Sequence, residues 1–443
     1  MQSFEEGGHS SIRKAGNKWT ALCLALLLLA GAEFVLRGPG RAVYLATQYN
    51  DFLSLYIQAH AWVRGQDPYS PETLLSLWPA EASHFSFLAK EVADGSIIAK
   101  RGIPTAYPIT SLVLIAPFSL LPWLVAYALW LAINLALFSI MLCALVALAG
   151  LSYREPSAVL LVSITLALAP FHTGIVTANV TLVAVELGVI AVWTARARHD
   201  VTTAVLVAMS VGLKPQIGFC FLLYYLARRR WRIFGMIVLV VVLIAGSGLL
   251  RLELGHTSWL RNYVNDNRVL LETGILANFT PINPTRFGLI NLQVVLYQLV
   301  RSTRLANNLA FSVGVVFLVV WAVGMWRGRA RNDLEMLDLS AIAIASLLPV
   351  YHRFYDAALL VLPLCWVFVS FRKARMLGSL SLMLVLPFLI PGGTILDSME
   401  RSGRIPPTLA GRWWWEVIVV PHQVWMLFFL AVLLLKEMNT VSD

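Results

Sequence analysis

The sequence predicts an all-α integral membrane protein, a helical bundle of about twelve transmembrane helices. Of its 443 residues, 58% are hydrophobic and only 13% are charged, whereas a soluble domain carries about 25% charged residues. Apolar runs of about 18 residues recur along the whole chain, as membrane-spanning helices require. Because no polar block is long enough to form a soluble domain, residues 1–443 are predicted to form a single transmembrane domain.

The basic residues set the predicted orientation. The net charge is +10, but Lys and Arg occur in short clusters between apolar runs, and no basic face with interleaved aromatics points to nucleic acid. Cytoplasmic loops are enriched in Lys and Arg, and placing every cluster there requires two crossings between neighbouring clusters. Both termini are then cytoplasmic, in a multi-pass protein of the cell membrane. The predicted spans are residues 19–36, 123–147, 157–171, 178–195, 201–214, 216–227, 232–250, 303–326, 337–351, 355–371, 376–391 and 417–435.

Three large loops then lie outside, at 37–122, 251–302 and 392–416. Within the first, segment 107–121 is apolar but rich in proline, and a full crossing there would put every later basic cluster on the wrong side. We therefore expect a helix that lies in the outer interface or dips into it. The first span, 19–36, could be an uncleaved anchor or a cleaved signal peptide, and we expect the anchor.

Most of the unusual polar residues fall at this outer face. Ionisable groups at membrane depth are costly and usually mark a functional cavity. The set is Asp51, His60, Asp67, Tyr107, His172, Asn179, Lys214, Gln216, His256, Asp266, His352, Arg353, Tyr355 and Asp356. Their convergence predicts a site there.

Asp51 is the sharpest candidate, because it stands just before Phe52–Val63, a stretch that we expect to form a helix along the membrane surface. Its carboxylate could act as a base in a cleft. Alternatively, Asn50 or Asp51 could simply cap the helix. The two interpretations are compatible, since a residue at a helix start can also point into a cleft.

Three cationic residues could bind a phosphate. Lys214 precedes Pro215, which breaks the helix and frees backbone groups, so that Lys214 could serve as a point charge or snorkel to the headgroups. His352 and Arg353 could neutralise a phosphate together. The alternative is an interfacial belt in which Arg353 pairs with Asp356. We also expect His172 and Asn179 to bracket a short non-helical piece, 173–178, between two spans.

The sequence predicts no metal and no cofactor. The cysteines, Cys23, Cys143, Cys220 and Cys365, lie singly in apolar runs, which fits buried thiols better than zinc ligands or disulfides. No Asp-x-Asp or His cluster has metal-ligand spacing.

Four stretches of the chain form a recognisable set. They are Asn50-Asp51-Phe52 with Tyr56 and Gly65-Gln66-Asp67-Pro68-Tyr69; Ala106-Tyr107-Pro108 with Leu114-Ile115-Ala116-Pro117-Phe118 and Leu121-Pro122; Leu213-Lys214-Pro215-Gln216 with Arg228-Arg229-Arg230-Trp231; and Pro349 with His352 and Tyr355-Asp356. Taken together, they resemble glycosyltransferase family 87, polytopic enzymes of the GT-C superfold. The chain departs from the family pattern at Thr177-Ala178-Asn179, where many members have Gly-Gln before the Asn, and its late motif lacks a Trp and a second His.

The resemblance implies an inverting transfer of a sugar, typically mannose, from a polyprenyl-phosphate donor to a glycan or glycolipid hydroxyl at the outer face. It implies that Asp51 is the catalytic base. Lys214, His352 and Arg353 are then the candidates for binding the donor phosphate. The expected substrate-pocket residues are Tyr107, His172, Asn179, Gln216, Tyr355 and Asp356. The expected partners are membrane lipid, the lipid-linked sugar and its acceptor.

Two alternatives stay open. One is a related transferase that uses a different lipid-linked sugar, such as arabinose or glucose, or modifies protein or lipid A. The other is a transporter or flippase of polyprenyl-linked substrates. Transporters often show internal repeats and broken helices near the midplane, and no repeat is visible here, which favours an enzyme.

Overall fold

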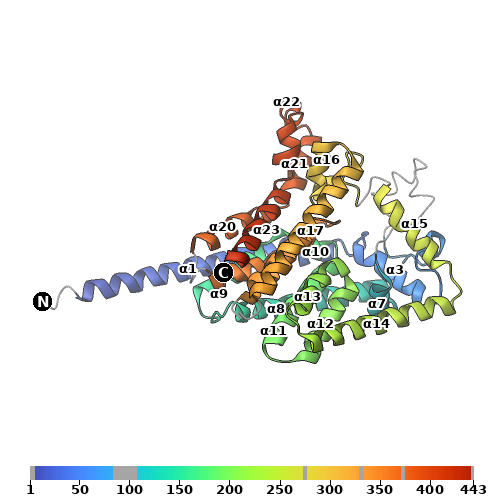
Figure 1. Ribbon diagram of the computed structural model, residues 1–443, viewed down its shortest axis with the longest axis horizontal. Coiled ribbons are helices and arrows are strands. Elements are labelled where there is room, and N and C mark those ends of the chain that lie inside the picture. The colour runs from blue at the N-terminus through green and yellow to red at the C-terminus, as the bar shows by residue number, and fades with distance from the viewer. Residues whose placement is uncertain (1–4, 83–106, 273–276, 329–333, 371–374, 441–443) are drawn as a thin grey trace.

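The chain folds into packed helices. The computed structural model describes residues 5–82, 107–272, 277–328, 334–370 and 375–440. In these ranges every regular element is a helix, and the only strand-like contact is an isolated antiparallel bridge between Leu289 and Arg353. The predicted all-α class is therefore confirmed (Figure 1).

The helices are bounded as follows: α1 Glu5–Arg37, α2 Pro39–Tyr44, α3 Asp51–Val63, α4 Pro71–Ser76, α7 Ile109–Ser119, α8 Trp123–Leu148, α9 Pro156–Ala167, α10 Ala169–Val176, α11 Val180–Arg196, α12 Asp200–Leu213, α13 Pro215–Ala227, α14 Trp231–Leu254, α15 Trp259–Glu272, α16 Gln293–Val300, α17 Thr303–Gly328, α18 Glu335–Ser346, α19 Val361–Ser370, α20 Arg375–Val385, α21 Gly392–Arg401, α22 Pro407–Ala410 and α23 His422–Thr440. Shorter 3-10 turns are η1 Arg286–Gly288, η3 Phe354–Leu360 and η4 Leu386–Leu389, and a π-turn, η5, covers Trp415–Val419.

Five helices among the described residues are long and apolar enough to cross a membrane. They are α14, α8, α17, α23 and a span in α1 and α2 over Lys18–Tyr44. Two bent pairs, α9 with α10 and α20–η4 with α21, raise the number to seven. The chain is thus a helical membrane protein, while the count of twelve spans is not confirmed.

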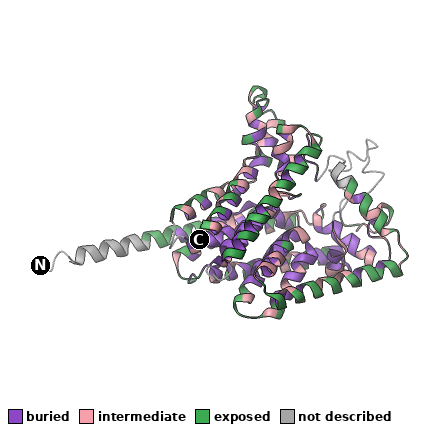
Figure 2. Cartoon of the chain, viewed as in Figure 1, coloured by how far each residue is buried: buried purple, intermediate pink, exposed green. Residues whose placement is uncertain are grey.

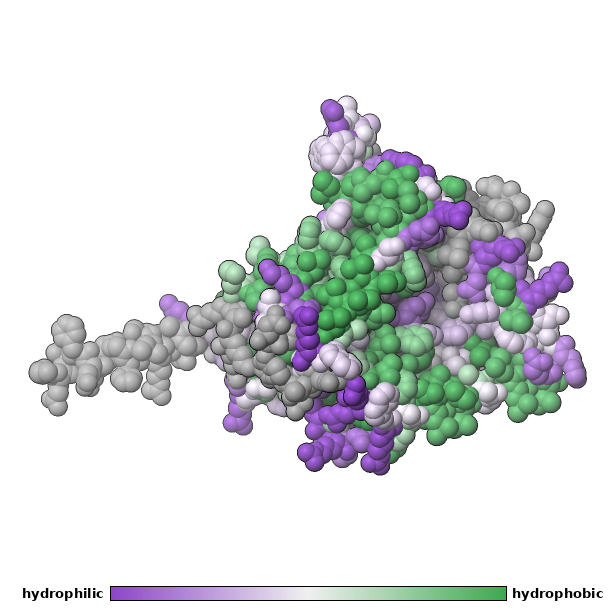
Figure 3. All heavy atoms as spheres, in the orientation of Figure 1, coloured by the Kyte–Doolittle hydropathy of each residue, from purple (hydrophilic) through white to green (hydrophobic). Residues whose placement is uncertain are grey.

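The exposed faces of the long helices agree with this conclusion. Leu28 in α1, Leu243 in α14 and Phe311 in α17 each expose more than 60% of their surface. Green, exposed ribbon follows these helices in Figure 2, and the visible faces of α14 and α17 are hydrophobic in Figure 3. In water such surfaces would be costly, whereas lipid tails are their natural surroundings.

Several predicted breaks are real. α12 ends at Leu213 and α13 begins at Pro215, so the helices meet at Lys214 as the proline predicts. They then pack closely, since a Cβ on Gly218 would lie 2.4 Å from the Val211 backbone. The expectation of a non-helical piece over 173–178 is wrong, because α10 continues to Val176 and only the last two residues form the turn.

The described part of residues 37–122, the predicted first outer loop, is largely helical. α3 forms where it was expected, and nearly all of its residues are buried, packed against α7. The Tyr56 hydroxyl donates to the Leu121 carbonyl at 2.7 Å, and His60 Nδ1 lies 2.7 Å from the Ser119 carbonyl. The C-terminal end of α7 is therefore tied to α3.

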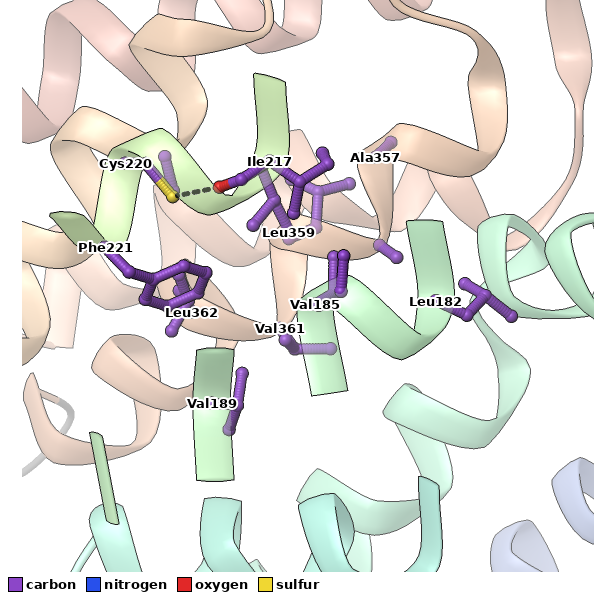
Figure 4. Close-up of a cluster of buried hydrophobic side chains, with 14 of the residues drawn as sticks. Leu182, Val185, Val189, Ile217, Cys220, Phe221, Ala357, Leu359, Val361 and Leu362 are labelled. Carbon is purple, nitrogen blue, oxygen red and sulfur yellow. Dashed lines mark hydrogen bonds between the residues drawn. The ribbon is translucent and has the colours of Figure 1, made fainter. Parts of the chain in front are cut away.

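A tightly packed core lies beneath the ends of α11, α13 and η3. Figure 4 shows Leu182, Ile217 and Ala357 among its side chains, and all three are buried. Leu182 and Ala357 directly follow polar residues in the chain, and Ile217 comes three residues after Lys214. The core therefore fixes the backbone that carries those polar residues.

Candidate functional site

The site begins at the start of α3, where two neighbouring residues have different roles. Asn50 is the N-cap, and its side-chain oxygen accepts from the Leu53 backbone N–H at 3.0 Å. The Asp51 backbone N–H donates to the Thr177 carbonyl at 2.9 Å. The Asp51 carboxylate is therefore not needed to cap α3 and points toward the turn before α11.

Asn179 holds this carboxylate. Its Nδ2 donates to Asp51 Oδ2 at 2.6 Å and to the Tyr107 hydroxyl at 3.2 Å. Its Oδ1 caps α11 by accepting from the Thr181 N–H at 2.9 Å. Because the same amide caps a helix and contacts two site residues, its orientation is fixed from both ends.

The turn that presents Asn179 is also held in place. Ala178 has a φ of +50°, a conformation that is uncommon for a residue with a Cβ. The Trp130 indole N–H donates to its carbonyl at 3.2 Å, and the Trp130 ring stacks on Phe52 with centroids 4.8 Å apart. Trp130 thus links the two segments that carry Asp51 and Asn179.

A second carboxylate, Asp356, forms the buried centre of the site. Lys214 Nζ and Thr181 Oγ1 lie 2.6 Å and 2.7 Å from its Oδ1. His352 Nδ1 and the Arg353 backbone N–H lie 3.0 Å and 2.9 Å from its Oδ2. Asp356 therefore ties together α11, the α12–α13 junction and the start of η3.

Lys214 is held in the same network. It is 9% exposed, and its ammonium also lies 2.6 Å from Thr181 Oγ1 and 4.9 Å from the centre of the Tyr355 ring. A buried ammonium needs both a countercharge and hydrogen-bond partners. Asp356 supplies the countercharge, so part of the positive charge of Lys214 is already balanced.

Arg353 is placed differently. Its side chain is only partly buried, and no ion pair of its guanidinium occurs among the described residues. It nonetheless acts electrostatically on both Asp51 and Asp356. Of the cations gathered here, Arg353 is therefore the one whose side chain is not paired with a carboxylate in the described part of the chain.

Burial raises the pKa of the Asp51 carboxyl above its ordinary value. The Asn179 hydrogen bond lowers it, as do the charges of Arg353 and Lys214 and a hydrogen bond from Tyr355. Desolvation is the largest of these effects. Burial also raises the pKa of Tyr107, which keeps that hydroxyl neutral. The result is a carboxyl group made more basic than a solvated aspartate.

The structure brings together most of the predicted site residues. Asp51, Tyr107, Asn179, Lys214, His352, Arg353, Tyr355 and Asp356 form one connected set. His352 is fully buried and faces Asp356, with its Nε2 left without a hydrogen bond. His352 is therefore better placed to orient Asp356 than to bind the donor phosphate directly.

Two predicted pocket residues do not join this set. His172 is buried against α1, where its Nε2 lies 2.7 Å from the Leu166 carbonyl and its ring packs edge-on against Phe34. Gln216 is half-buried in the first turn of α13, with no hydrogen-bond partner among the described residues. Proximity in sequence to Asn179 and Lys214 suggested both residues, but their side chains leave the helices elsewhere.

One member of the site was missed from the sequence. Thr181 Oγ1 lies 2.7 Å from Asn179 Oδ1 and 2.7 Å from Asp356 Oδ1. In the sequence it is a β-branched residue at the start of an apolar run. A hydroxyl two residues after a capping Asn is the signal that could have identified it, because both point to the same end of the helix.

No metal centre is evident where the structure is described, since no group of three His, Cys, Asp or Glu side chains is placed to bind an ion there. The free thiols Cys23, Cys220 and Cys365 are buried, while Cys143 is exposed. The expectation that the protein needs no metal stays a prediction.

A helical membrane protein with a recessed carboxylate, set beside amide, hydroxyl and cationic groups, has the parts of a polar group-transfer site. Glycosyltransferase family 87 matches residues 105–351, more than half of the chain. The chain belongs to this family and is a membrane glycosyltransferase. No curated protein and no solved structure matches it.

The matched region and the site overlap only in part. Tyr107, Asn179 and Lys214 lie inside residues 105–351, but Asp51 precedes them and His352 to Asp356 follow them. The fold brings these outlying residues onto the matched ones. The geometry therefore supplies evidence on Asp51 and Asp356 that is independent of the family match.

We predict that Asp356→Ala destabilises the protein by about 3–5 kcal/mol, because it leaves the Lys214 ammonium buried without a countercharge. The free energy of unfolding, measured by denaturant titration in mixed micelles, checks this. The double variant Asp356→Ala, Lys214→Met removes both charges and should recover at least half of the loss.

The control is Asp200→Ala, which removes the partly exposed acid of a separate pair with the exposed Arg232 at 3.8 Å. It should cost about 1 kcal/mol or less. A double variant no more stable than Asp356→Ala alone would contradict the buried-pair account.

Proposed function

We propose that this glycosyltransferase moves a sugar, mannose in the first instance, from a polyprenyl phosphate to a glycan or glycolipid hydroxyl on the outer face of the membrane, with Asp51 as general base. The observation that carries the proposal is the Asp51 carboxylate itself. Asn50 caps α3 in its place, Asn179 orients it at 2.6 Å, and burial makes it more basic.

The proposed step is a single displacement. The acceptor hydroxyl donates its hydrogen to Asp51, and its oxygen attacks the anomeric carbon from the face opposite the phosphate. The bond from that carbon to the phosphate oxygen breaks, the polyprenyl phosphate leaves with the electron pair, and the proton stays on Asp51 until it passes to solvent. One displacement inverts the anomeric centre, so that a single base suffices and no protein nucleophile is needed.

The leaving phosphate needs fixed positive charge. Arg353 acts on Asp51 electrostatically and has no ion pair among the described residues, so its fork of donors suits a phosphate. Lys214 contributes further positive charge near Asp51, although Asp356 balances part of that charge. Fixed charges in a partly dry site stabilise a developing anion more than mobile water does.

A lipid-linked donor also needs room for its chain. An apolar groove of about 290 Å³ runs along the exterior of α8, lined by Val43, Ala46, Leu124, Tyr127, Leu131 and Leu135 among others. A groove residue is linked to the start of α3, because the Ala46 carbonyl accepts from the Trp123 indole at 3.3 Å and Trp123 stacks on Phe52, the residue after Asp51. We propose that the first isoprene units lie in this groove.

The choice of mannose rests on the family resemblance, and arabinose or glucose donors are the alternatives. A transporter of polyprenyl-linked substrates is the competing class. A transporter does not need a carboxylate like that of Asp51, which does not cap its helix, is oriented by the Asn179 amide and has a raised pKa. Sugar transfer, tested with each donor in turn, separates these cases.

We predict that Asp51→Asn lowers the transfer rate by about 10²–10⁴, the usual contribution of a general base. Purified protein in liposomes would be supplied with radiolabelled polyprenyl-phosphate mannose and a mixed lipid and glycan extract. Thermal stability should stay near wild type, since Asn50 retains the cap. The control Glu72→Gln changes an exposed acid on α4 and should leave transfer unchanged. A fully active Asp51→Asn would refute the mechanism.

The pH profile offers an independent test. Transfer requires ionised Asp51, so the rate should rise with pH through its pKa and fall away below it, with a midpoint above the ordinary aspartate value near 4. Asn179→Asp keeps a capping oxygen but sets a second carboxylate against Asp51. Like charges raise the pKa, so the midpoint should move up by about one unit or more. An unchanged midpoint would show that Asp51 is not the titrating group.

The groove can be tested by filling it. Ala128→Phe places a ring in the groove, whereas Leu129→Phe puts the same ring on an exposed neighbouring position outside it. We expect Ala128→Phe to raise KM several-fold for a long-chain donor, to affect a one-isoprene donor less, and to leave kcat largely intact. Equal effects of the two variants would show that the chain does not lie there.

A further inference from the structure

A polar pocket lies far from Asp51. It has a volume of about 420 Å³ and is lined by Arg196, Tyr224, Tyr225, Arg228, Arg230 and Glu335. These residues come from the end of α11, the end of α13 and the start of α18. Nothing in the proposed transfer reaction uses them.

This arginine pocket, as we call it, lies at the opposite end of α11 from the candidate active site. Asn179 caps the beginning of α11 and Arg196 ends it. Seventeen helical residues at about 1.5 Å each place them roughly 25 Å apart. α13 repeats the pattern, since it runs from Pro215, beside Lys214, to Ala227, beside Arg228.

Ion pairs and hydrogen bonds hold the side chains that line the arginine pocket. Arg196 pairs with Glu335 through its Nε and donates from Nη1 to the Leu148 carbonyl at 2.9 Å. The Tyr224 hydroxyl donates to Glu335 at 3.2 Å, and Arg228 pairs with Asp338. These contacts fix the walls and the direction of two guanidinium groups.

The residues that line the pocket carry more positive than negative charge within the described part of the chain. Three arginines face two carboxylates, those of Glu335 and Asp338. Arg230 is exposed and forms no ion pair among the described residues. It is also close enough to Tyr225 for its charge to act on that hydroxyl. The surplus charge therefore lies at the mouth, where an anion would enter.

Three exposed tryptophans near the pocket indicate its level relative to the lipid headgroups. Trp193 in the last turn of α11, Trp231 at the start of α14 and Trp326 near the end of α17 are all exposed. The Arg229 guanidinium lies 5.2 Å from the centre of the Trp326 ring. Exposed tryptophans gather at the headgroup level of membranes. Hydrophilic side chains also gather along the lower edge of the molecule near the α11–α12 turn (Figure 3).

We propose that the arginine pocket binds the phosphate headgroup of an anionic phospholipid, in the leaflet opposite the Asp51 site. Guanidinium groups recognise phosphate oxygens through paired hydrogen bonds. Basic pockets between transmembrane helices at the cytoplasmic side suit such headgroups. The tryptophans place the pocket where lipid phosphates lie, which favours a lipid over a free anion. A bound headgroup would bridge α11 and α13.

The test compares lipid binding to delipidated full-length protein by native mass spectrometry, with phosphatidylglycerol and phosphatidylcholine of identical acyl chains. We expect wild type to prefer phosphatidylglycerol, and Arg230→Gln to weaken that preference by about fivefold. Arg230→Lys should retain part of it. Arg198→Gln is the matched control, because Arg198 is exposed in the neighbouring turn, outside the pocket lining. Equal losses in Arg230→Gln and Arg198→Gln, or no preference in wild type, would overturn the proposal.

Inorganic phosphate distinguishes the two possible sources of the anion. If the headgroup phosphate occupies the pocket, millimolar phosphate should displace phosphatidylglycerol from wild type and have little effect on the residual binding to Arg230→Gln. If phosphate raises the thermal stability of wild type, but not of Arg230→Gln, while phosphatidylglycerol binds no better than phosphatidylcholine, the site takes a free anion and the lipid assignment is wrong. Neither result depends on sugar transfer.

Discussion

The buried carboxylate of Asp356 is the constraint on which the site-bearing end of this bundle depends. A charge removed from water must be met by several donors, and those donors come from α11, the α12–α13 junction and η3. The helices can therefore adopt only a relative placement that keeps all of them within reach. The packed side chains beneath the network, shown in Figure 4, hold the same three segments from the apolar side.

Much of this could be predicted from the sequence. Apolar runs gave the helical membrane class, Pro215 gave the break at Lys214, and polar residues at helix ends gave most members of the site. The partners of those residues could not be predicted, because pairing such as that of Lys214 with Asp356 spans 142 positions. His172 shows the opposite case, since a residue seven positions from Asn179 in the chain faces α1 instead. The number of membrane crossings could not be predicted either, because the length of a helix as short as α12 does not show whether it spans the membrane.

Membership in glycosyltransferase family 87 and the geometry contribute different information. The matched region supplies Asn179 and Lys214, and with them the class of enzyme. Asp51 and Asp356 fall outside it and enter through hydrogen bonds alone. Asn179 links the two halves of the site. Its Nδ2 donates to Asp51, and the Thr181 hydroxyl lies within hydrogen-bond distance of both Asn179 Oδ1 and Asp356 Oδ1. A change at Asn179 would therefore reach the basicity of one carboxylate and the surroundings of the other.

The beginning of α3 has a consequence for how this enzyme could change over time. Asn50 satisfies the free backbone N–H of the helix, and Asp51, its immediate neighbour, takes no part in that task. In the proposed mechanism, helix capping and base catalysis therefore depend on two separate residues. A single substitution could remove the carboxylate and leave the helix start intact. Under the proposed mechanism, the resulting protein would be inactive but well folded, and it could then evolve a binding role.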